Sequence, residues 1–144
     1  MFSPAKSLCR RTAVSMMVLV LSGALKARAQ PAHPKAFWYE AALEMRKLAE
    51  SWGDQPYGAV LVQGGTLIGN GPSRVIQHNN PDAHAEREAI RDAIARVGAA
   101  QVRGAVLYST SRPCALCERA AAKAGIARMY FGPALQDAGV PARG

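Results

Sequence analysis

Cysteine and histidine are scarce in this sequence, with three of each among 144 residues. Small domains held together by disulfides use several spaced cysteine pairs, so a disulfide framework is excluded. Internal repeats and low-complexity segments are absent from the sequence as well. A composition of 49% apolar and 19% charged residues is typical of a globular protein, and the length suits one domain. The sequence therefore predicts a single globular unit.

Acidic residues are missing from positions 1–29, where five basic residues stand. The remaining positions carry 13 basic and 10 acidic residues, so the net charge of +8 for the whole chain falls to +3 for this part. A surface with so small an excess of positive charge does not predict a large nucleic-acid footprint. The charge therefore favours a small substrate over a nucleic acid.

Residues 1–29 have the three parts of a signal peptide: the basic stretch MFSPAKSLCRR, an uncharged run at 12–25, and Ala27-Arg28-Ala29 as a cleavage site. The run covers 14 residues, whereas a spanning helix needs about 20, so stable membrane anchoring is not expected. We predict an exported protein, periplasmic or secreted, and Arg10-Arg11 hints at the twin-arginine route. There are two alternatives. The segment could be an uncleaved anchor, or translation could start at a codon further downstream, which would leave the protein cytoplasmic.

Apolar periodicity and turn residues predict the order of helices and strands. The predicted elements are a helix at 34–52, a hairpin at 57–69, a loop at 70–82, a helix at 83–97, a strand at 106–110, a helix from Pro113 to Gly125 and a strand at 126–131. In the second half of the chain helices alternate with strands, which implies right-handed crossovers and parallel pairing of the last strands. We therefore predict a three-layer α/β/α sandwich with a mixed sheet. Its parts are an N-terminal helical segment at 30–55, a core at 56–132 and a short C-terminal tail at 133–144.

Cys114 and Cys117 are the two cysteines that follow the predicted signal peptide. At positions i and i+3 of the first turn of a helix they share a face, so both thiolates can reach one metal ion. A redox dithiol, a pair of plain buried cysteines and a purely structural zinc site are the other interpretations. The structural zinc site would need a fourth protein ligand, for which no candidate is evident in the sequence.

A third zinc ligand would be a histidine, and His33, His78 and His84 are the three available. His84 opens the helix at 83–97, so it would lie at a helix N-terminus that follows the sheet, where ligands collect in open α/β folds. The positive ends of two helix dipoles there would also stabilise thiolates. Glu86, two residues further on, would lie beside the metal and could move a proton from a zinc-bound water to a leaving group.

These residues carry a resemblance to the cytidine deaminase-like superfamily, and more closely to its branch of guanine deaminases, nucleoside deaminases and tRNA adenosine deaminases. The matching segments keep the family order over about 77 residues: PYGAV at 56–60, PDAHAE at 81–86 with AIR at 89–91, LYST at 107–110, PCALC at 113–117 and YFG at 130–132. H-x-E followed by P-C-x-x-C is the signature of zinc deaminases.

The resemblance implies a zinc-dependent hydrolytic deaminase of a nucleobase or nucleoside, with purines favoured. Zn²⁺ would be bound by His84, Cys114 and Cys117, and water would take the fourth position. Glu86 would take a proton from that water and return it to the departing ammonia. The alternatives are a catalytically poor zinc-binding remnant and a tRNA adenosine deaminase.

The candidate substrate-binding residues implied by the resemblance are Asn70, Ser73, Ala85, Arg112 and Pro113. The family usually has an asparagine eleven residues before the metal histidine, where this chain has Ser73, and Asn70 lies three residues earlier. Arg112 stands where the branch commonly has an acid. A cation at the rim of the site could attract a phosphate or an acidic group.

The chain stops 12 residues after the YFG segment, whereas the family continues with a strand and helices that help to close the pocket. Parallel sheets are normally covered on both faces, and an exposed apolar face is expected to find a partner. Members of this branch commonly pair, with the metal-site helices near the interface. We therefore expect a homodimer in which a neighbour helps to close the pocket next to Arg112.

Overall fold

The structure is a computed structural model that describes residues 32–143. The segment 1–29, predicted to be a signal peptide, lies outside these residues, so export stays a prediction. Within 32–143, none of the helices has both the length and the apolar composition that crossing a bilayer requires.

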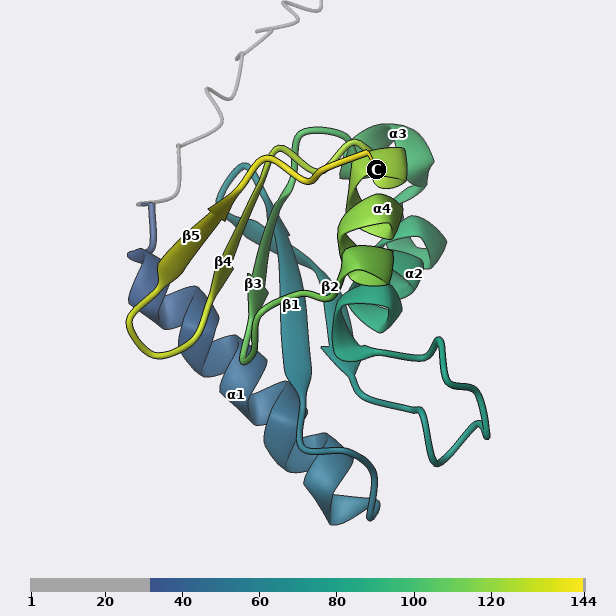
Figure 1. Cartoon of the computed structure of the whole chain (residues 1–144). Helices are drawn as coiled ribbons and strands as arrows, with labels where there is room; N and C mark the ends of the chain where they lie inside the picture. The colour runs from purple at the N-terminus through teal and green to yellow at the C-terminus, as the bar shows by residue number, and fades with distance from the viewer. Residues whose placement is uncertain (1–31, 144) are drawn as a thin grey trace, which may run out of the picture.

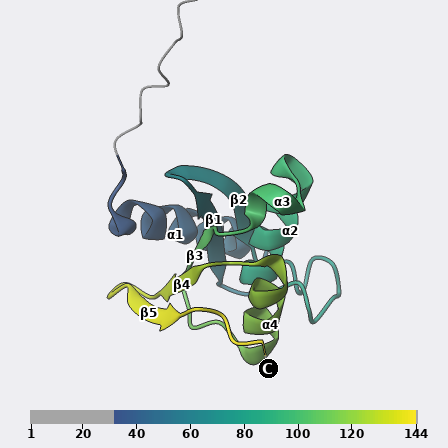
Figure 2. The same ribbon diagram turned by 90° about the horizontal axis from the view of Figure 1, so that it is seen from above.

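The described residues form a five-stranded mixed sheet with helices on both faces (Figures 1 and 2). The strand order is β2-β1-β3-β4-β5, with β3 and β4 parallel and the other neighbours antiparallel. This arrangement confirms the predicted three-layer α/β/α sandwich. The elements are α1 (Lys35–Ser51), β1 (Gly58–Gln63), β2 (Thr66–Pro72), α2 (Ala85–Val97), α3 (Ala99–Val102), β3 (Val106–Ser109), α4 (Ala115–Ala124), β4 (Arg128–Phe131) and β5 (Gln136–Gly139).

Helix α1 covers one face of the sheet by itself. Its Trp38 and Ala42 pack on Val60 of β1 and Tyr108 of β3, which all are buried. The helix comes so close to β1 that a Cβ atom at Gly58 would lie 2.2 Å from the carbonyl oxygen of Ala42. Glycine is therefore required where the strand begins, because any side chain would push the helix away from the sheet.

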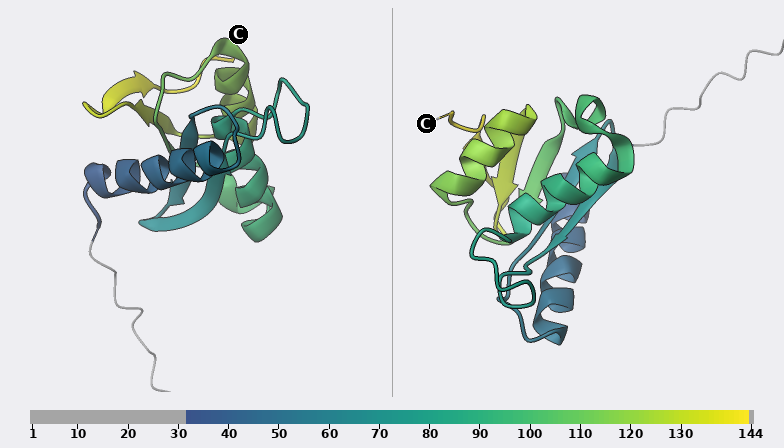
Figure 3. Two further views of the ribbon diagram at one scale, coloured as in Figure 1. Left: turned by 90° about the horizontal axis from the view of Figure 1, so that it is seen from below. Right: turned by 90° about the vertical axis from the view of Figure 1, so that its right-hand side faces the viewer.

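Strand β2 is longer than predicted, because it includes residues 70–72, for which the sequence predicts a loop. Gly71 pairs with Ala59 of β1, and a Cβ atom at Gly71 would lie 2.0 Å from the carbonyl oxygen of Ala85 in α2. The glycines in this segment therefore allow α2 to approach the strand and do not mark a turn. The remaining loop, 73–84, extends away from the body of the molecule (Figure 3).

Helices α2 and α4 lie side by side on the other face (Figure 3, right). Between them and the sheet lies the main core, which includes Leu61, Ile90, Leu107, Ala121 and Met129, all buried. Pro113 was expected to begin the last helix, but α4 starts at Ala115 with Cys114 as its N-cap residue. Gly125 ends the helix in the left-handed conformation, with φ of 78°, as its position predicted.

Two short elements were not expected from the sequence. Helix α3 follows Gly98 directly after α2, and β5 lies in the segment 133–144 that was described as a tail. Residues of β5 pair with Met129, Tyr130 and Phe131 of β4, which makes β5 an edge of the sheet. Each of these elements is only four residues long, too short to show an apolar periodicity.

Candidate metal centre

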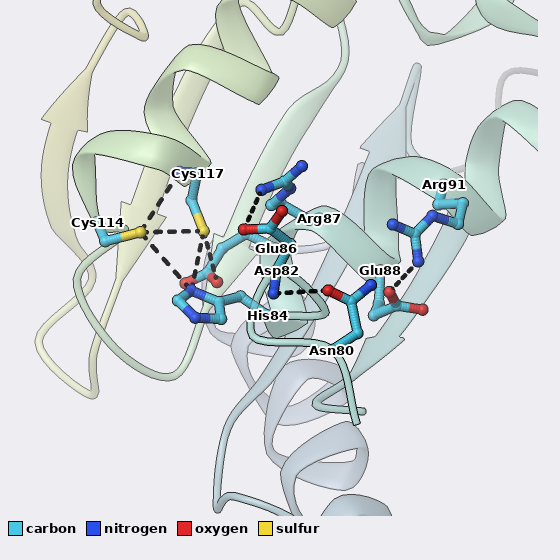
Figure 4. A network of polar contacts seen from close by, with 9 residues as sticks. All are labelled: Asn80, Asp82, His84, Glu86, Arg87, Glu88, Arg91, Cys114 and Cys117. Carbon is cyan, nitrogen blue, oxygen red and sulfur yellow. Dashed lines mark hydrogen bonds and ion pairs between the residues drawn. The ribbon is translucent and has the colours of Figure 1, made fainter. Parts of the chain in front are cut away.

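His84, Cys114 and Cys117 meet at the N-terminal ends of α2 and α4 (Figure 4). The Nδ1 atom of His84 lies 3.6 Å from Sγ of Cys114 and 3.5 Å from Sγ of Cys117, and the two sulfur atoms are 3.4 Å apart. Their ligand atoms all fall within 4.8 Å of one another. Among residues 32–143 they are the one group of histidine, cysteine and acidic side chains with this spacing.

The start of α4 places the two cysteines on the same side. Cys114 is the N-cap residue, and its Sγ accepts a hydrogen bond from the backbone N–H of Cys117 at 3.4 Å. Cys114 is exposed, whereas Cys117 is buried. The first turn of the helix thus brings one sulfur from the surface and one from the interior to a common point.

The donor set fits a zinc ion. Burial raises the pKa of the Cys117 thiol well above its ordinary value, and the nearby carboxylate of Glu86 raises it further. A bound dication reverses this preference, because it stabilises the thiolate and offsets the negative charge of the carboxylate. One nitrogen and two sulfur ligands are a typical catalytic zinc set, which leaves one coordination position open.

Glu86 lies beside this cluster and is only 5% exposed. Its Oε1 accepts a hydrogen bond from the hydroxyl of Ser109 at 2.8 Å, and its Oε2 lies 3.5 Å from Sγ of Cys117. Ser109 is fully buried at the end of β3, and its Oγ also accepts a weak hydrogen bond from the N–H of Ser111 at 3.4 Å. The carboxylate therefore has one oxygen held by the sheet and one facing the cluster.

Ser109 was not identified from the sequence as part of the site. One feature of the sequence could have indicated it. Ser109 is a hydroxyl residue in the matching segment LYST, within a strand whose other residues are mostly apolar. A buried polar side chain needs a partner, and here that partner is 23 positions away in the sequence. Only the fold shows that the partner is Glu86.

A pocket of about 260 Å³ opens at the cluster. It is lined by Gln55, Tyr57, His84, Ala85, Glu86, Ser111, Arg112 and Cys114. Ala85 and Arg112 were candidate substrate-binding residues, and the structure places both at this pocket. Gln55, Tyr57 and Ser111 were not expected there, although all three border or belong to segments that resemble the family.

Ser73 does not reach the pocket. It is fully buried, and its hydroxyl donates a hydrogen bond to Oδ1 of Asp54 at 3.0 Å. The other oxygen of Asp54 accepts from the backbone N–H groups of Ile76 and Gln77 at 3.0 and 2.8 Å. Burial would raise the pKa of Asp54, but these hydrogen bonds hold it below its usual range. Ser73 thus belongs to a buried anchor of the loop 73–84, and its role as a substrate contact stays a prediction.

Asn70 lines a different hollow, and Pro113 is buried between two residues that do line the pocket, Arg112 and Cys114. Asn70 is inside β2, pairs with Val60, and borders a separate hollow whose other walls include Arg74 and Asp92. Pro113 is buried and is not among the lining residues. Asn70 as a substrate-binding residue stays a prediction, although in this structure its side chain lines that other hollow.

Comparisons with known proteins agree with this geometry. Residues 33–133 match the family model described as the cytidine and deoxycytidylate deaminase zinc-binding region. The tRNA-specific adenosine deaminase of Buchnera aphidicola subsp. Schizaphis graminum is 35% identical over 102 residues, which cover 71% of this chain and 68% of that protein. The guanine deaminase of Bacillus subtilis is 44% identical over 62 residues, 43% of this chain and 40% of that protein.

The fold has solved relatives too. The crystal structure of guanine deaminase from Bacillus subtilis superposes with a TM-score of 0.65 at 31% identity, covering 69% of this chain and 64% of that one. In these three comparisons the matched part of this chain covers between 40% and 68% of the length of the other protein. Because the matched residues include the histidine, the glutamate and both cysteines of the cluster, this chain belongs to the cytidine and deoxycytidylate deaminase family that is defined by its zinc-binding region.

Proposed function

We propose that the protein is a zinc-dependent hydrolytic deaminase that acts on a nucleobase or nucleoside, with purines preferred, and releases ammonia. The observation that carries the proposal is the position of Glu86. Its carboxylate is buried at the inner end of a small pocket, with Oε1 held by Ser109 and Oε2 beside the cluster. A carboxylate placed in this way can transfer protons in the pocket without leaving its position.

His84, Cys114 and Cys117 would hold the zinc ion. When bound, zinc supplies a water whose pKa is lowered toward about 7. Glu86 accepts a proton from the attacking water and delivers it to the amine nitrogen of the substrate. The carbon that carried the amine gains an oxygen, and the nitrogen leaves as ammonia, so one water is consumed for each ammonia released. Ser109 acts as a positioning residue that keeps Oε2 directed at the pocket.

Purine substrates are supported by the relatives, which are named as a guanine deaminase and tRNA-specific adenosine deaminases. A tRNA adenosine deaminase is the second candidate, because such enzymes match the larger share of this chain. The excess of only three basic residues in positions 30–144 favours the small substrate.

Ammonia release from a panel of substrates tests the proposal. The zinc-loaded protein should release ammonia from at least one purine base or nucleoside and not from the pyrimidines. The panel should include a tRNA anticodon hairpin, whose selective deamination would favour the second candidate. Zinc bound at about one ion per chain, with no ammonia from any of these or from the nucleoside monophosphates, would identify a catalytically poor zinc-binding remnant.

We also propose that the protein forms a homodimer in which a neighbour helps to close the pocket next to Arg112. Exposed apolar side chains on the two metal-site helices support this: Leu116 on α4 is 49% exposed, and Ile94 on α2 is 41% exposed. Between these helices lies a hollow of about 510 Å³, with apolar side chains that include Ile90, Ile94 and Ala124 and with four basic residues in its lining, Arg87, Arg91, Arg103 and Lys123. A second copy would cover this surface.

The dimer predicts that mass and activity depend on concentration. Light scattering should give a dimer at micromolar concentration, and specific activity should fall together with mass on dilution. Ile94→Asp should shift the protein toward the monomer, whereas Ile76→Asp, on the exposed loop 73–84, should not. A monomer that is fully active at nanomolar concentration would contradict the proposal.

A further inference from the structure

Arg112 is the one arginine, and no lysine is present, among the described residues that line the metal-site pocket. Six other arginines pair with a carboxylate within 4.0 Å, whereas Arg112, like Arg103, Arg119 and Arg143, has no such partner among residues 32–143. Its guanidinium lies over the ring of Phe131, 5.9 Å from the ring centre. The aromatic ring supports the side chain and leaves the donor groups of the guanidinium free to bind a ligand.

The pocket has opposite charges at its two ends. Glu86 is nearly inaccessible at the inner end, whereas Arg112 is exposed at the rim. The lining between them is neutral, with Tyr57, Gln55 and Ser111 contributing polar groups and one aromatic ring. A negative group on a ligand would therefore be repelled from the inner end and attracted to the rim.

The pocket is large enough for only part of a nucleotide substrate. Its volume of about 260 Å³ is below the range of roughly 300–1,000 Å³ that is usual for sites that enclose a drug-sized ligand. The pocket can enclose a base that carries the reacting amine, but not a whole nucleotide. Any group attached through the sugar must leave through the opening, where Arg112 lies.

The guanidinium of Arg112 can bind an anionic ligand at this rim, two residues before the sulfur ligand Cys114. A guanidinium presents paired N–H donors that match the oxygens of a phosphate, and hydrogen bonds of this kind are among the strongest in proteins. The chemistry of the rim therefore fits a phosphate monoester better than a neutral sugar.

We propose that the substrate is a purine nucleoside monophosphate, whose phosphate binds Arg112 while its base enters the pocket. The inference rests on the proposed deaminase function and adds the charge of the substrate to it. The phosphate takes no part in the reaction: water replaces the amine, ammonia leaves, and the phosphate ester stays intact. The free nucleotide is preferred over a phosphate within an RNA chain, because positions 30–144 have an excess of only three basic residues.

The test compares adenosine and guanosine with their 5′-monophosphates. The zinc-loaded protein should have a kcat/KM for one monophosphate that is higher than that for its nucleoside by about 10- to 100-fold, as expected for hydrogen bonds between charged groups. In Arg112→Gln this ratio should fall to about one. Arg112→Lys keeps the positive charge but lacks the paired N–H donors of the guanidinium, so it should retain part of the preference. Arg119→Gln is the matched control, because Arg119 is exposed on α4 and does not line the pocket. Zinc content is measured for every variant.

The outcomes separate this inference from the proposed function. Equal kcat/KM for nucleosides and monophosphates, unchanged in Arg112→Gln, would overturn the role of Arg112 and leave deamination standing. If no substrate is turned over, the deaminase proposal fails. Calorimetric titration of the zinc-loaded protein with nucleosides and monophosphates then tests the role of Arg112 separately. Monophosphates that bind more tightly than nucleosides, through Arg112, support the inference, and equal binding refutes it. Deamination of an RNA hairpin without any preference for the monophosphates would also refute it.

Discussion

The purified protein is expected to bind about one zinc ion per chain, and the Cys117→Ala variant is expected to bind none. A catalytic zinc site has three protein ligands, and removal of one leaves two, with no fourth ligand in the cluster to compensate. Cys114→Ala and His84→Ala should lose the metal for the same reason. Elemental analysis by mass spectrometry after dialysis measures the zinc content directly.

His78→Ala is the matched control for the metal experiment, because His78 is exposed on the loop 73–84 and does not belong to the cluster. Its zinc content should equal that of the unmodified protein. The two sulfur atoms are 3.4 Å apart, so intact-mass measurement under non-reducing conditions should accompany the analysis. A stable, metal-free Cys114–Cys117 disulfide as the active form would reject the zinc interpretation and favour a redox pair.

Glu86→Gln is expected to lower turnover by about 100-fold or more while the zinc content stays at one ion per chain. The amide keeps the shape of the side chain and the hydrogen bond from Ser109, but it cannot accept the proton of the attacking water. Glu86→Ala should have a similar effect on turnover. Steady-state ammonia release, normalised to bound zinc, is the required measurement.

Glu88→Gln provides the comparison for Glu86. Glu88 is also buried in the first turn of α2, at 7% exposure, but its carboxylate pairs with Arg91 and points away from the cluster (Figure 4). Turnover in this variant should stay within a few-fold of the unmodified protein, since no proton transfer is removed. Full activity in Glu86→Gln would show that another group moves the proton.

The metal ligands were predictable from sequence because their geometry is local. Cys114 and Cys117 share the first turn of one helix, and His84 and Glu86 share the first turn of another, so short spacings already determine which side chains lie together. The three-layer fold was predictable for a related reason. Alternation of apolar helices and strands permits few arrangements in which every apolar face is covered.

The surroundings of the metal ligands depended on tertiary structure. Ser73 and Asn70 lie close to His84 in the sequence, yet one is bound to Asp54 and the other points away from the pocket. In a strand the side chains alternate between faces, so the direction of Asn70 depends on the register of β2 against β1, in which Asn70 pairs with Val60. The contacts of Glu86 with Ser109 and of Arg112 with the ring of Phe131 likewise join residues that only the packing of α2 and α4 on the sheet brings together.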